Sequence, residues 1–335
     1  MKKMLSVNDV CGAVVTYGNR ANLLEKTIQS FIDNGVSEII CVFNGCDDHV
    51  YDYISDRFKN KIRLTPVILK SNLGSAGGFT SALEAFKFES GKELVWILDD
   101  DNFAEKNALD ELINFANGLS EVAIVCSNRT EFNIFGKLES GIPIEIMYPK
   151  NSSFLGISIW TIFPTTKRFF NKRIGNFGKS NDVNWICVPQ VPWGGMLIPR
   201  AVLDNNILPP KEFYLYADDT AFCVLAGKYN FRFFIVKSSR VIDLDASYHL
   251  EKADIDRFSK IILSTPVENV NYSVRNNCYI DRNLRPKNSM TYIINKNIYM
   301  IILLIFCLKY RRLGRFIEIG RLVSLGERGK LGIMQ

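Results

Sequence analysis

The sequence lacks the cysteine and histidine spacings from which zinc and redox centres are usually built. It has two histidines and eight cysteines among 335 residues, and no two cysteines form a CxxC pair. Several cysteines lie inside apolar runs, such as Ile40-Cys41-Val42 and Val125-Cys126, where a cysteine acts as a small hydrophobic residue. This usage argues against a zinc module and favours a reducing compartment. Because the first ten residues lack the apolar core of a secretory signal, we expect a cytoplasmic protein.

The common nucleotide-binding loops are also missing. No GxxxxGK[ST] segment occurs, which excludes the P-loop class. The glycine cluster at 72–78, NLGSAGG, is not GxGxxG and follows the third predicted strand, so a dinucleotide-binding domain is a poor match. The formal net charge of +6 is modest, and we expect no nucleic-acid partner.

Long hydrophobic runs are scarce. Residues 298–308, IYMIILLIFCL, form an apolar stretch of 11 residues, whereas a membrane-spanning helix needs about 20. The charged residues after it are mainly basic: Lys309, Arg311, Arg312, Arg315, Arg321, Arg328 and Lys330, against Glu318 and Glu327. These features are typical of a helix lying at an anionic membrane face, and equally of a buried core helix followed by a solvated basic face.

The first half of the sequence alternates strand and helix patterns. Apolar strand-like runs lie at 10–16, 39–43, 62–69, 94–98 and 122–126, and helical spacing of apolar residues occurs at 21–33, 74–88 and 109–119. Strands separated by helices predict βαβ crossovers, and therefore an α/β domain with a mostly parallel sheet flanked by helices. Ligands bind such sheets outside the carboxyl ends of the strands, where the polar clusters of this sequence lie.

The second half is patterned differently. Residues 132–185 show no clear period, and we expect them to be irregular. A last strand-like segment runs from Val241 to Leu244, and helical patterns follow Tyr248. We therefore expect two domains, an α/β domain at 1–245 and a helical C-terminal region at 246–335.

Three consecutive carboxylates, Asp99, Asp100 and Asp101, follow the apolar strand at 94–98. Adjacent carboxylates repel one another, and burial increases that repulsion unless a divalent cation neutralises it. Oxygen ligands suit Mg²⁺ or Mn²⁺. Strand alternation predicts Asp99 and Asp101 on one face and Asp100 on the other. The alternative is a solvated acidic turn before the helix that starts near Asn107.

A second acidic pair, Asp218-Asp219, ends the aromatic stretch FYLYA at 213–217. A carboxylate beside a dry aromatic wall suits a general base, and Asp219 equally suits the start of a helix at 220–226. His249 follows the last predicted strand and is a possible third metal ligand, although a lone histidine is more often a packed or surface residue. We interpret His49 as an ordinary surface residue.

These segments together resemble the family-2 glycosyltransferases with the GT-A fold, and within them bacterial galactofuranosyl- and rhamnosyltransferases. Residues 14–20, VVTYGNR, resemble the VTYNR strand and loop, and residues 42–48, VFNGCDD, resemble VDNGSTD. Residues 72–79 resemble NxGGAGGF, 99–101 resemble the metal-binding DxD, and 218–219 resemble the acidic pair that supplies the base. Residues 272–276, YSVRN, resemble YYxxRN. The sequence departs from these patterns at Phe43, Ala221 and Asn271.

The resemblance implies a role for each matching residue. The nucleotide-sugar donor would be bound by Thr16, Tyr17, Arg20, Asn44, Asn72, Gly74, Ala76, Gly77, Gly78, Asp99 and Asp100. The metal, Mn²⁺ or Mg²⁺, would be held by Asp99, Asp101 and His249. The catalytic base would be Asp219. The glycan acceptor would be bound by Trp193, Gly194, Gly195, Asp218, Tyr272, Arg275 and Asn276.

The reaction implied is direct, inverting transfer of a sugar to a lipid-linked or growing surface polysaccharide. UDP-galactofuranose is the favoured donor and dTDP-rhamnose the alternative. The basic and apolar C-terminal region would contact the inner face of the cell membrane peripherally. Two other classes stay open: a sugar-nucleotide nucleotidyltransferase, although residues 16–20 lack its GxGTRL loop, and a non-catalytic carbohydrate-binding protein, although the acidic residues are all present.

Overall fold

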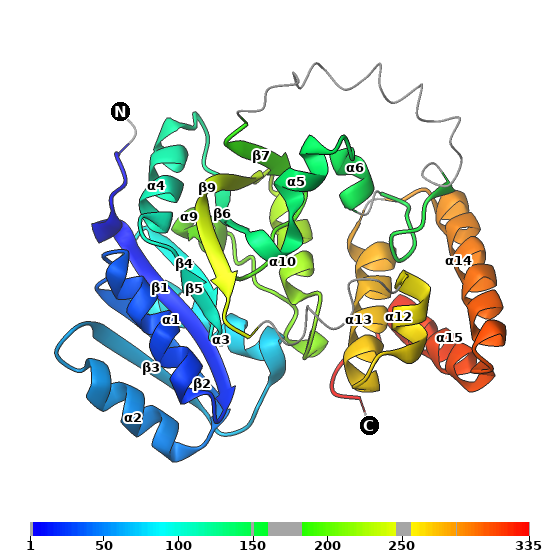
Figure 1. Ribbon diagram of the computed structural model, residues 1–335, viewed down its shortest axis with the longest axis horizontal. Helices are drawn as coiled ribbons and strands as arrows, with labels where there is room; N and C mark the ends of the chain where they lie inside the picture. The colour runs from blue at the N-terminus through cyan, green and yellow to red at the C-terminus, as the bar shows by residue number, and fades with distance from the viewer. Residues whose placement is uncertain (1–2, 149–150, 160–182, 246–255, 286, 335) are drawn as a thin grey trace. The chain divides into compact units, whose positions relative to one another are not determined.

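The chain divides into two compact units. The computed structural model describes residues 3–148, 151–159, 183–245, 256–285 and 287–334. The first unit comprises 1–135, 184–214 and 218–249, and the second comprises 136–183, 215–217 and 250–335 (Figure 1). The chain enters the second unit for the last time after residue 249, near the boundary expected at 245. Residues 136–183 and 215–217, which we expected in the first domain, belong to the second unit.

A nine-stranded sheet forms the centre of the first unit, in the order β3-β2-β1-β4-β8-β6-β9-β5, with β7 paired to β9. The strands are β1 Val10–Gly18, β2 Glu38–Cys46, β3 Arg63–Leu69, β4 Leu94–Asp99, β5 Asn102–Ala104, β6 Ile124–Arg129, β7 Trp185–Val188, β8 Met196–Pro199 and β9 Phe233–Asp243. Strands β1 to β4 run parallel, whereas β8 is antiparallel to β4 and β6. The predicted α/β class is confirmed, and the sheet is mixed.

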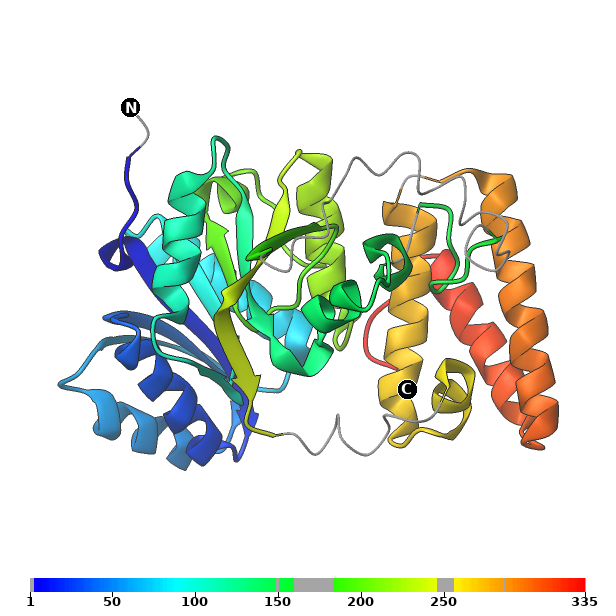
Figure 2. The same cartoon turned by 45° about the horizontal axis from the view of Figure 1, so that its top comes forward.

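Helices flank this sheet (Figure 2). They are α1 Ala21–Asp33, α2 Asp48–Phe58, α3 Gly74–Glu89, α4 Ala108–Gly118, α9 Arg200–Asp204 and α10 Asp218–Lys228. In α1 the apolar spacing predicted from sequence buries Leu24, Ile28 and Phe31 completely. Phe31 meets Trp96 of β4 edge to face, with ring centroids 5.4 Å apart. The main core therefore lies between the sheet and its covering helices.

The strands that the sequence did not predict are short or pair with distant segments. β5 has three residues and β7 and β8 have four each. β9 begins at Phe233, although only its end was predicted, at Val241. Part of the stretch expected to be irregular is ordered, since α5 Ile134–Glu139 and α6 Ile144–Met147 lie within it. Pairing such as β8 with β4 depends on residues about a hundred positions apart, which local periodicity does not report.

The second unit is mainly helical, as predicted for the C-terminal region. Its longer helices are α12 Arg257–Leu263, α13 Val267–Tyr279, α14 Ser289–Lys309 and α15 Leu313–Glu327, and a π-helical turn at Ile280–Leu284 follows α13. A separate core includes Phe154, Val274, Tyr299, Leu303 and Ile319. In both views α15 lies between α13 and α14 (Figures 1 and 2).

Candidate active site

The polar segments singled out in the sequence meet where parallel strands of the first unit end. β1, β2 and β4 end at Gly18, Cys46 and Asp99. Because the three strands are parallel neighbours, their carboxyl ends share one edge of the sheet. Thr16, fully buried on β1, donates from Oγ1 to Asp100 Oδ2 at 2.7 Å. This contact joins segments that are 84 positions apart in the sequence.

The three aspartates do not alternate as a strand would. Arg20 Nε donates to both oxygens of Asp100, at 2.9 and 3.1 Å, and Nη2 donates to Asp101 Oδ2 at 2.8 Å. Asp99 instead faces Arg129, with its Oδ2 3.4 Å from Nη1. The chain turns directly after Asp99, so the strand alternation that predicted a shared face for Asp99 and Asp101 ends there. Arg20, expected at the nucleotide, is the counter-ion of the acidic segment.

Burial dominates the electrostatics of this segment. It raises the pKa of Asp99 to about 7, against the lowering effect of Arg129. It also raises the pKa of Asp100 to about 6, against the lowering effect of Arg20. The side chain of Asp99 is nevertheless 34% exposed, so a ligand can reach it. A further positive charge at this position would favour the ionised carboxylates.

Arg129, Asn102 and Asp243 complete the acidic cluster, and the sequence analysis missed all three. Arg129 Nη2 donates to Asp243 Oδ2 at 2.5 Å. Asn102 Nδ2 donates to Asp101 and Asp243 at 3.2 and 3.0 Å, and its Oδ1 accepts from the Asp99 amide at 3.1 Å. Arg129 and Asp243 end β6 and β9, and Asn102 begins β5. Their only sequence signal is a polar residue directly at a strand end.

The oxygen donors at this edge fit a hard divalent cation. Asp99, Asp100, Asp101 and Asp243 share the guanidinium groups of Arg20 and Arg129, which leaves an excess of negative charge. Among the residues that the structure describes, no group of three or more His, Cys, Asp or Glu side chains is arranged to hold a metal ion. The proposed third ligand, His249, lies outside the described residues. Carboxylate oxygens with surplus negative charge are the donors that Mg²⁺ and Mn²⁺ prefer.

The glycine loop is held in place by two asparagines that were expected to touch the donor. Asn44, 2% exposed, donates from Nδ2 to the carbonyl of Gly74 at 2.9 Å and accepts from the amide of Leu73 at 2.8 Å. Asn72 Oδ1 accepts from the amide of Gly74 at 2.8 Å. Both side chains therefore hold the loop in place, and a contact with the donor stays a prediction for Asn44 and Asn72.

Glycine is required at Gly74 and Gly78 of this loop. Gly74 has φ +72°, and a Cβ there would lie 2.0 Å from the carbonyl oxygen of Tyr214. A Cβ at Gly78 would lie 2.5 Å from Val15 Cγ1. Ala76, Gly77 and Gly78 are all buried in the first turns of α3. The small residues let the start of α3 pack directly on β1.

The two acids of the second pair have different surroundings. Asp218 is 3% exposed and accepts hydrogen bonds from Trp193 Nε1 at 2.8 Å and from Ser75 Oγ at 3.1 Å. Asp219 is half-buried and accepts from the Thr220 amide at 2.5 Å. Burial, followed by repulsion from Asp218, raises the pKa of Asp219 to about 7. Asp218 is thus fixed within the protein, whereas Asp219 is the acid with a pKa suited to taking up a proton near neutral pH. Both residues also begin α10, which starts at Asp218, slightly before the helix start that the alternative interpretation gave to Asp219.

Residues 193–195 connect the two acidic groups. Trp193 holds Asp218, and the next residue, Gly194, lies against Asp99 and Arg129. A Cβ at Gly194 would lie 2.1 Å from Asn102 Oδ1, 2.6 Å from Arg129 Nη1 and 2.8 Å from Asp99 Oδ2. Gly195 has φ +94° and donates its amide to the carbonyl of Ile97 on β4 at 2.8 Å. This short segment therefore places the aspartates of β4 and of α10 at one site.

The predicted acceptor residues on α13 of the second unit are buried. Tyr272, Arg275 and Asn276 are 4%, 2% and 0% exposed. Tyr272 Oη accepts from the Met334 amide at 2.8 Å, and Arg275 Nη1 donates to the Gly332 carbonyl at 2.6 Å. These contacts fix the end of the chain on α13. A role in acceptor binding stays a prediction for all three residues.

Two hollows lie beside the loops after β1 and β2. One, of about 470 Å³, is lined by residues that include Arg20, His49 and Tyr53. The other, of about 210 Å³, is lined by residues that include Phe43 and Asp47. His49, which we interpreted as an ordinary surface residue, accordingly lines a hollow next to the counter-ion of the acidic segment.

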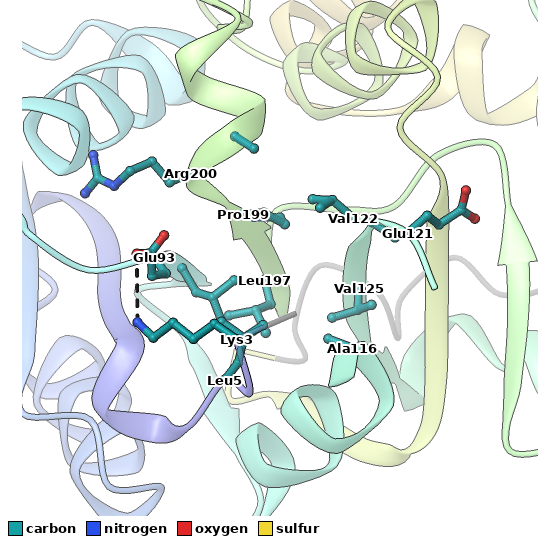
Figure 3. Close-up of a pocket in the computed structure, with 13 residues that line it drawn as sticks. Lys3, Leu5, Glu93, Ala116, Glu121, Val122, Val125, Leu197, Pro199 and Arg200 are labelled. Carbon is teal, nitrogen blue, oxygen red and sulfur yellow. Dashed lines mark ion pairs between the residues drawn. The ribbon is translucent and has the colours of Figure 1, made fainter. Parts of the chain in front are cut away.

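A third cavity, of about 280 Å³, lies at the opposite end of the sheet (Figure 3). It is lined largely by apolar residues, among them Leu5, Val125 and Leu197, with Lys3 and Glu93 at its edge. Leu94 at its wall is the first residue of β4, whose last residue is Asp99. This cavity is therefore separate from the acidic cluster.

Comparison with known proteins identifies the chain's relatives. The model of glycosyl transferase family 2 matches residues 13–182. The crystal structure of S. aureus TarS (residues 1–349) is similar with a TM-score of 0.50 and 14% identity, covering 96% of this chain and 91% of that one. GalNAc-T7, whose structure contains UDP, GalNAc and Mn²⁺, has a TM-score of 0.51 and 12% identity over 79% of this chain. The chain spans about half of GalNAc-T7, 47% of its length. No curated protein matches the chain by sequence.

Proposed function

The chain belongs to glycosyl transferase family 2, and we propose that it moves a sugar from a nucleotide-sugar donor to a glycan acceptor in a single, inverting displacement. The α/β fold with its helical C-terminal region agrees with the GT-A expectation drawn from the sequence. The observation that best supports the chemistry is the segment Trp193-Gly194, which brings the aspartates after β4 together with the acidic pair of α10. Two acidic groups at one sheet edge suit the two demands of the reaction, neutralising a diphosphate and accepting a proton.

The donor is proposed to lie over the loops that end β1 and β2. Tyr17 is 48% exposed and has the Arg20 guanidinium 5.1 Å from its ring centroid, so both can meet a nucleotide. The start of α3 offers backbone amides that favour phosphate. GalNAc-T7 was crystallised with UDP, which is consistent with a uridine nucleotide. We favour UDP-galactofuranose as the donor, with dTDP-rhamnose as the alternative.

Asp99 and Asp101, with His249, would hold Mn²⁺ or Mg²⁺. The ion, when bound, would supply positive charge to the departing diphosphate. Arg20 would then keep Asp100 and Asp101 ionised and oriented, through contacts of 2.9 and 2.8 Å. Arg129 does the same for Asp99.

Asp219 is the proposed general base. Its carboxylate takes the proton of an acceptor hydroxyl while that oxygen attacks the anomeric carbon and the bond to the diphosphate oxygen breaks on the opposite face. Asp218 is a positioning residue, since Trp193 and Ser75 hold it at the start of α10. The acceptor is proposed to be a lipid-linked or growing surface polysaccharide at the cytoplasmic face of the membrane, approaching beside Trp193, Gly194 and Gly195.

The experiment is release of nucleotide from a panel of sugar nucleotides, with and without Mn²⁺. Wild type is compared with Asp219→Asn and with Asp110→Asn, a matched change of an exposed carboxylate on α4. We expect one nucleotide to be released in a metal-dependent way, undiminished in Asp110→Asn and lost in Asp219→Asn. Binding of UDP is followed by thermal shift in all three proteins. Release that persists in Asp219→Asn would contradict the assignment of the base, and absence of both binding and release would contradict the donor site.

A further inference from the structure

Helix α14 presents an apolar face to solvent. Ile301, Ile305 and Leu308 are 59%, 58% and 55% exposed, and Met290 and Ile294 continue the same stripe toward the start of the helix. These positions are separated by 4, 7, 4 and 3 residues, which places them on one side of an α-helix. The opposite side is buried through Tyr292, Tyr299, Leu303 and Cys307. An aliphatic stripe directed away from the core that its own helix builds indicates a binding surface.

Among the described residues of its unit, the position of α14 leaves this stripe exposed. In both views α14 lies at the outer edge of the second unit, with α15 on its inner side (Figures 1 and 2). The inner side is fixed by specific contacts. Glu327 of α15 accepts from Tyr292 Oη at 2.9 Å and pairs with Lys296 Nζ at 2.6 Å. The rotation of α14, and hence the outward direction of the stripe, is therefore set by the fold.

The part of the second unit that contains the stripe carries an excess of positive charge. Residues 287–334 contain nine basic side chains, Lys287, Lys296, Lys309, Arg311, Arg312, Arg315, Arg321, Arg328 and Lys330, against only two acidic ones, Glu318 and Glu327. Both glutamates are engaged, Glu327 with Lys296 at 2.6 Å and Glu318 with Arg315 at 2.8 Å. Lys309, Arg311 and Arg312 are exposed at the end of α14, next to Leu308. Aliphatic side chains beside an excess of cations complement an anionic lipid surface.

A spanning orientation does not suit α14, although its 21 residues make it the one described helix that is long and apolar enough to cross a membrane. Asn295, Lys296 and Asn297 interrupt it, which leaves 11 consecutive apolar residues from Ile298. At about 1.5 Å per residue such a run is roughly half as long as the hydrocarbon core is thick. The ion pair of Lys296 with Glu327 also ties α14 to the rest of its unit.

A second copy of the chain is a poorer occupant than lipid. Self-association through the stripe would bring two copies of the cationic end, Lys309, Arg311 and Arg312, to one interface whose own acids are already engaged. Repulsion between these groups disfavours such a pair, whereas anionic head groups neutralise them.

We propose that the exposed stripe of α14, with Lys309, Arg311 and Arg312, lies flat in the head-group region of an anionic bilayer and anchors the protein to it. An anchor of this kind would hold the protein where a lipid-linked acceptor is found. Only this link to the acceptor rests on the proposed function. Binding to lipid needs neither donor nor acceptor, so the two proposals can fail separately.

The test is co-sedimentation of the full-length protein with vesicles of phosphatidylcholine alone or mixed with phosphatidylglycerol. We expect binding to the anionic vesicles that weakens with salt. Ile301→Glu combined with Ile305→Glu should lower the partition constant by at least about tenfold, because two aliphatic side chains no longer enter the interface. Arg311→Glu combined with Arg312→Glu should lower it by about tenfold or more on anionic vesicles only.

Matched controls come from the first unit. Phe88→Glu changes an exposed apolar residue and Lys106→Glu an exposed cation, and neither should alter vesicle binding. Circular dichroism and donor hydrolysis show whether each variant is folded. Equal binding to neutral and anionic vesicles would overturn the proposal. Binding of both double variants as tight as that of the wild type would also overturn it. So would a dimer, seen by light scattering, that forms without vesicle binding and that Ile301→Glu with Ile305→Glu dissociates. Protein that resists alkaline extraction from the vesicles would indicate a spanning helix and would contradict the proposal as well.

Discussion

The two units depart from the usual distribution of side chains in opposite directions. The first unit buries acids at the end of β4 and at the start of α10, where burial raises the pKa values of Asp99, Asp100 and Asp219. The second unit exposes aliphatic residues such as Ile301 and Ile305, which most proteins bury. The second unit also buries an acid, Asp281, but there one carboxylate is paired with one guanidinium, that of Arg285, at 2.6 Å. In the first unit four carboxylates share the guanidinium groups of Arg20 and Arg129. The difference teaches that unusual residues mark a site when their own unit leaves their charge or their apolar surface incompletely matched.

The largest expected effect is removal of the divalent cation for which the excess carboxylates of the first unit are suited. Chelation should lower nucleotide release by more than about a hundredfold, since metal charge stabilises the leaving group by several kcal/mol. It should also remove the rise in melting temperature that UDP produces. Restoring Mn²⁺ should restore both. Unchanged release in the presence of chelator would mean that Arg20 and Arg129 neutralise the acidic segment without a metal ion.

Breaking the matched acid of the second unit should affect stability instead of chemistry. Asp281 is 2% exposed and accepts from Arg285 Nη1 at 2.6 Å and from the Leu155 amide at 2.8 Å. Asp281→Asn should destabilise this unit by about 3 kcal/mol, because it removes one partner of a buried pair. Urea unfolding followed by hydrogen exchange in α13 measures this, with the exposed Asp110→Asn as control. If the α13 amides of Asp281→Asn exchange as slowly as those of the wild type, the pair of Asp281 with Arg285 does not stabilise this unit.

A smaller effect should follow from crowding the segment that joins the two acidic groups of the first unit. Gly194→Ala places a Cβ 2.1 Å from Asn102 Oδ1, so Asn102 or Arg129 must move. We expect a loss of about 1–3 kcal/mol in stability and a reduced rate of nucleotide release. Gly118→Ala, where a Cβ meets nothing within 4 Å, is the matched control. A fully active Gly194→Ala variant would show that the close packing of this segment is not needed for activity.

The pH dependence of turnover should be the mildest of these effects. A general base works only when ionised, and burial raises the pKa of Asp219 to about 7. Turnover should therefore rise with pH through about 7 and level off above it. A rate profile that is flat between about pH 5 and pH 8 would exclude a base with this pKa.

The sequence predicted the parts of the first unit that local pattern determines. Apolar runs located β1 to β4, and the polar residues directly after them identified Thr16, Arg20 and the three aspartates. Arg129 was missed because β6 extends further than its apolar run. Asp243 lies within the last predicted strand segment, but the position of that strand in the sheet, beside β6 and β5, was not predicted. Local periodicity does not show which distant strand ends meet.

The roles of individual side chains were harder to predict than their place. Asn44 and Asn72 match a donor motif, yet their amides hold the glycine loop. Tyr272 and Arg275 match an acceptor motif, yet both are buried against the end of the chain. A motif fixes where a residue lies along an element, but the contacts that satisfy its polar atoms depend on packing that the sequence does not display. The outward stripe of α14 is a similar case, because apolar spacing alone suits a buried and an exposed face equally.

The most direct test of the central claim measures activity and stability on one variant, Asp219→Asn. The pKa of Asp219 rises from its ordinary value of 3.8 to about 7 in the folded protein. The carboxyl therefore stabilises the fold when protonated, and this contribution is lost as pH rises through about 7. If Asp219 is kept for chemistry, Asp219→Asn should be inactive, yet melt at a higher temperature than wild type above pH 7, with the difference disappearing at acidic pH. An inactive variant that is less stable at every pH would make Asp219 a structural residue, and an active variant would contradict its role as the base.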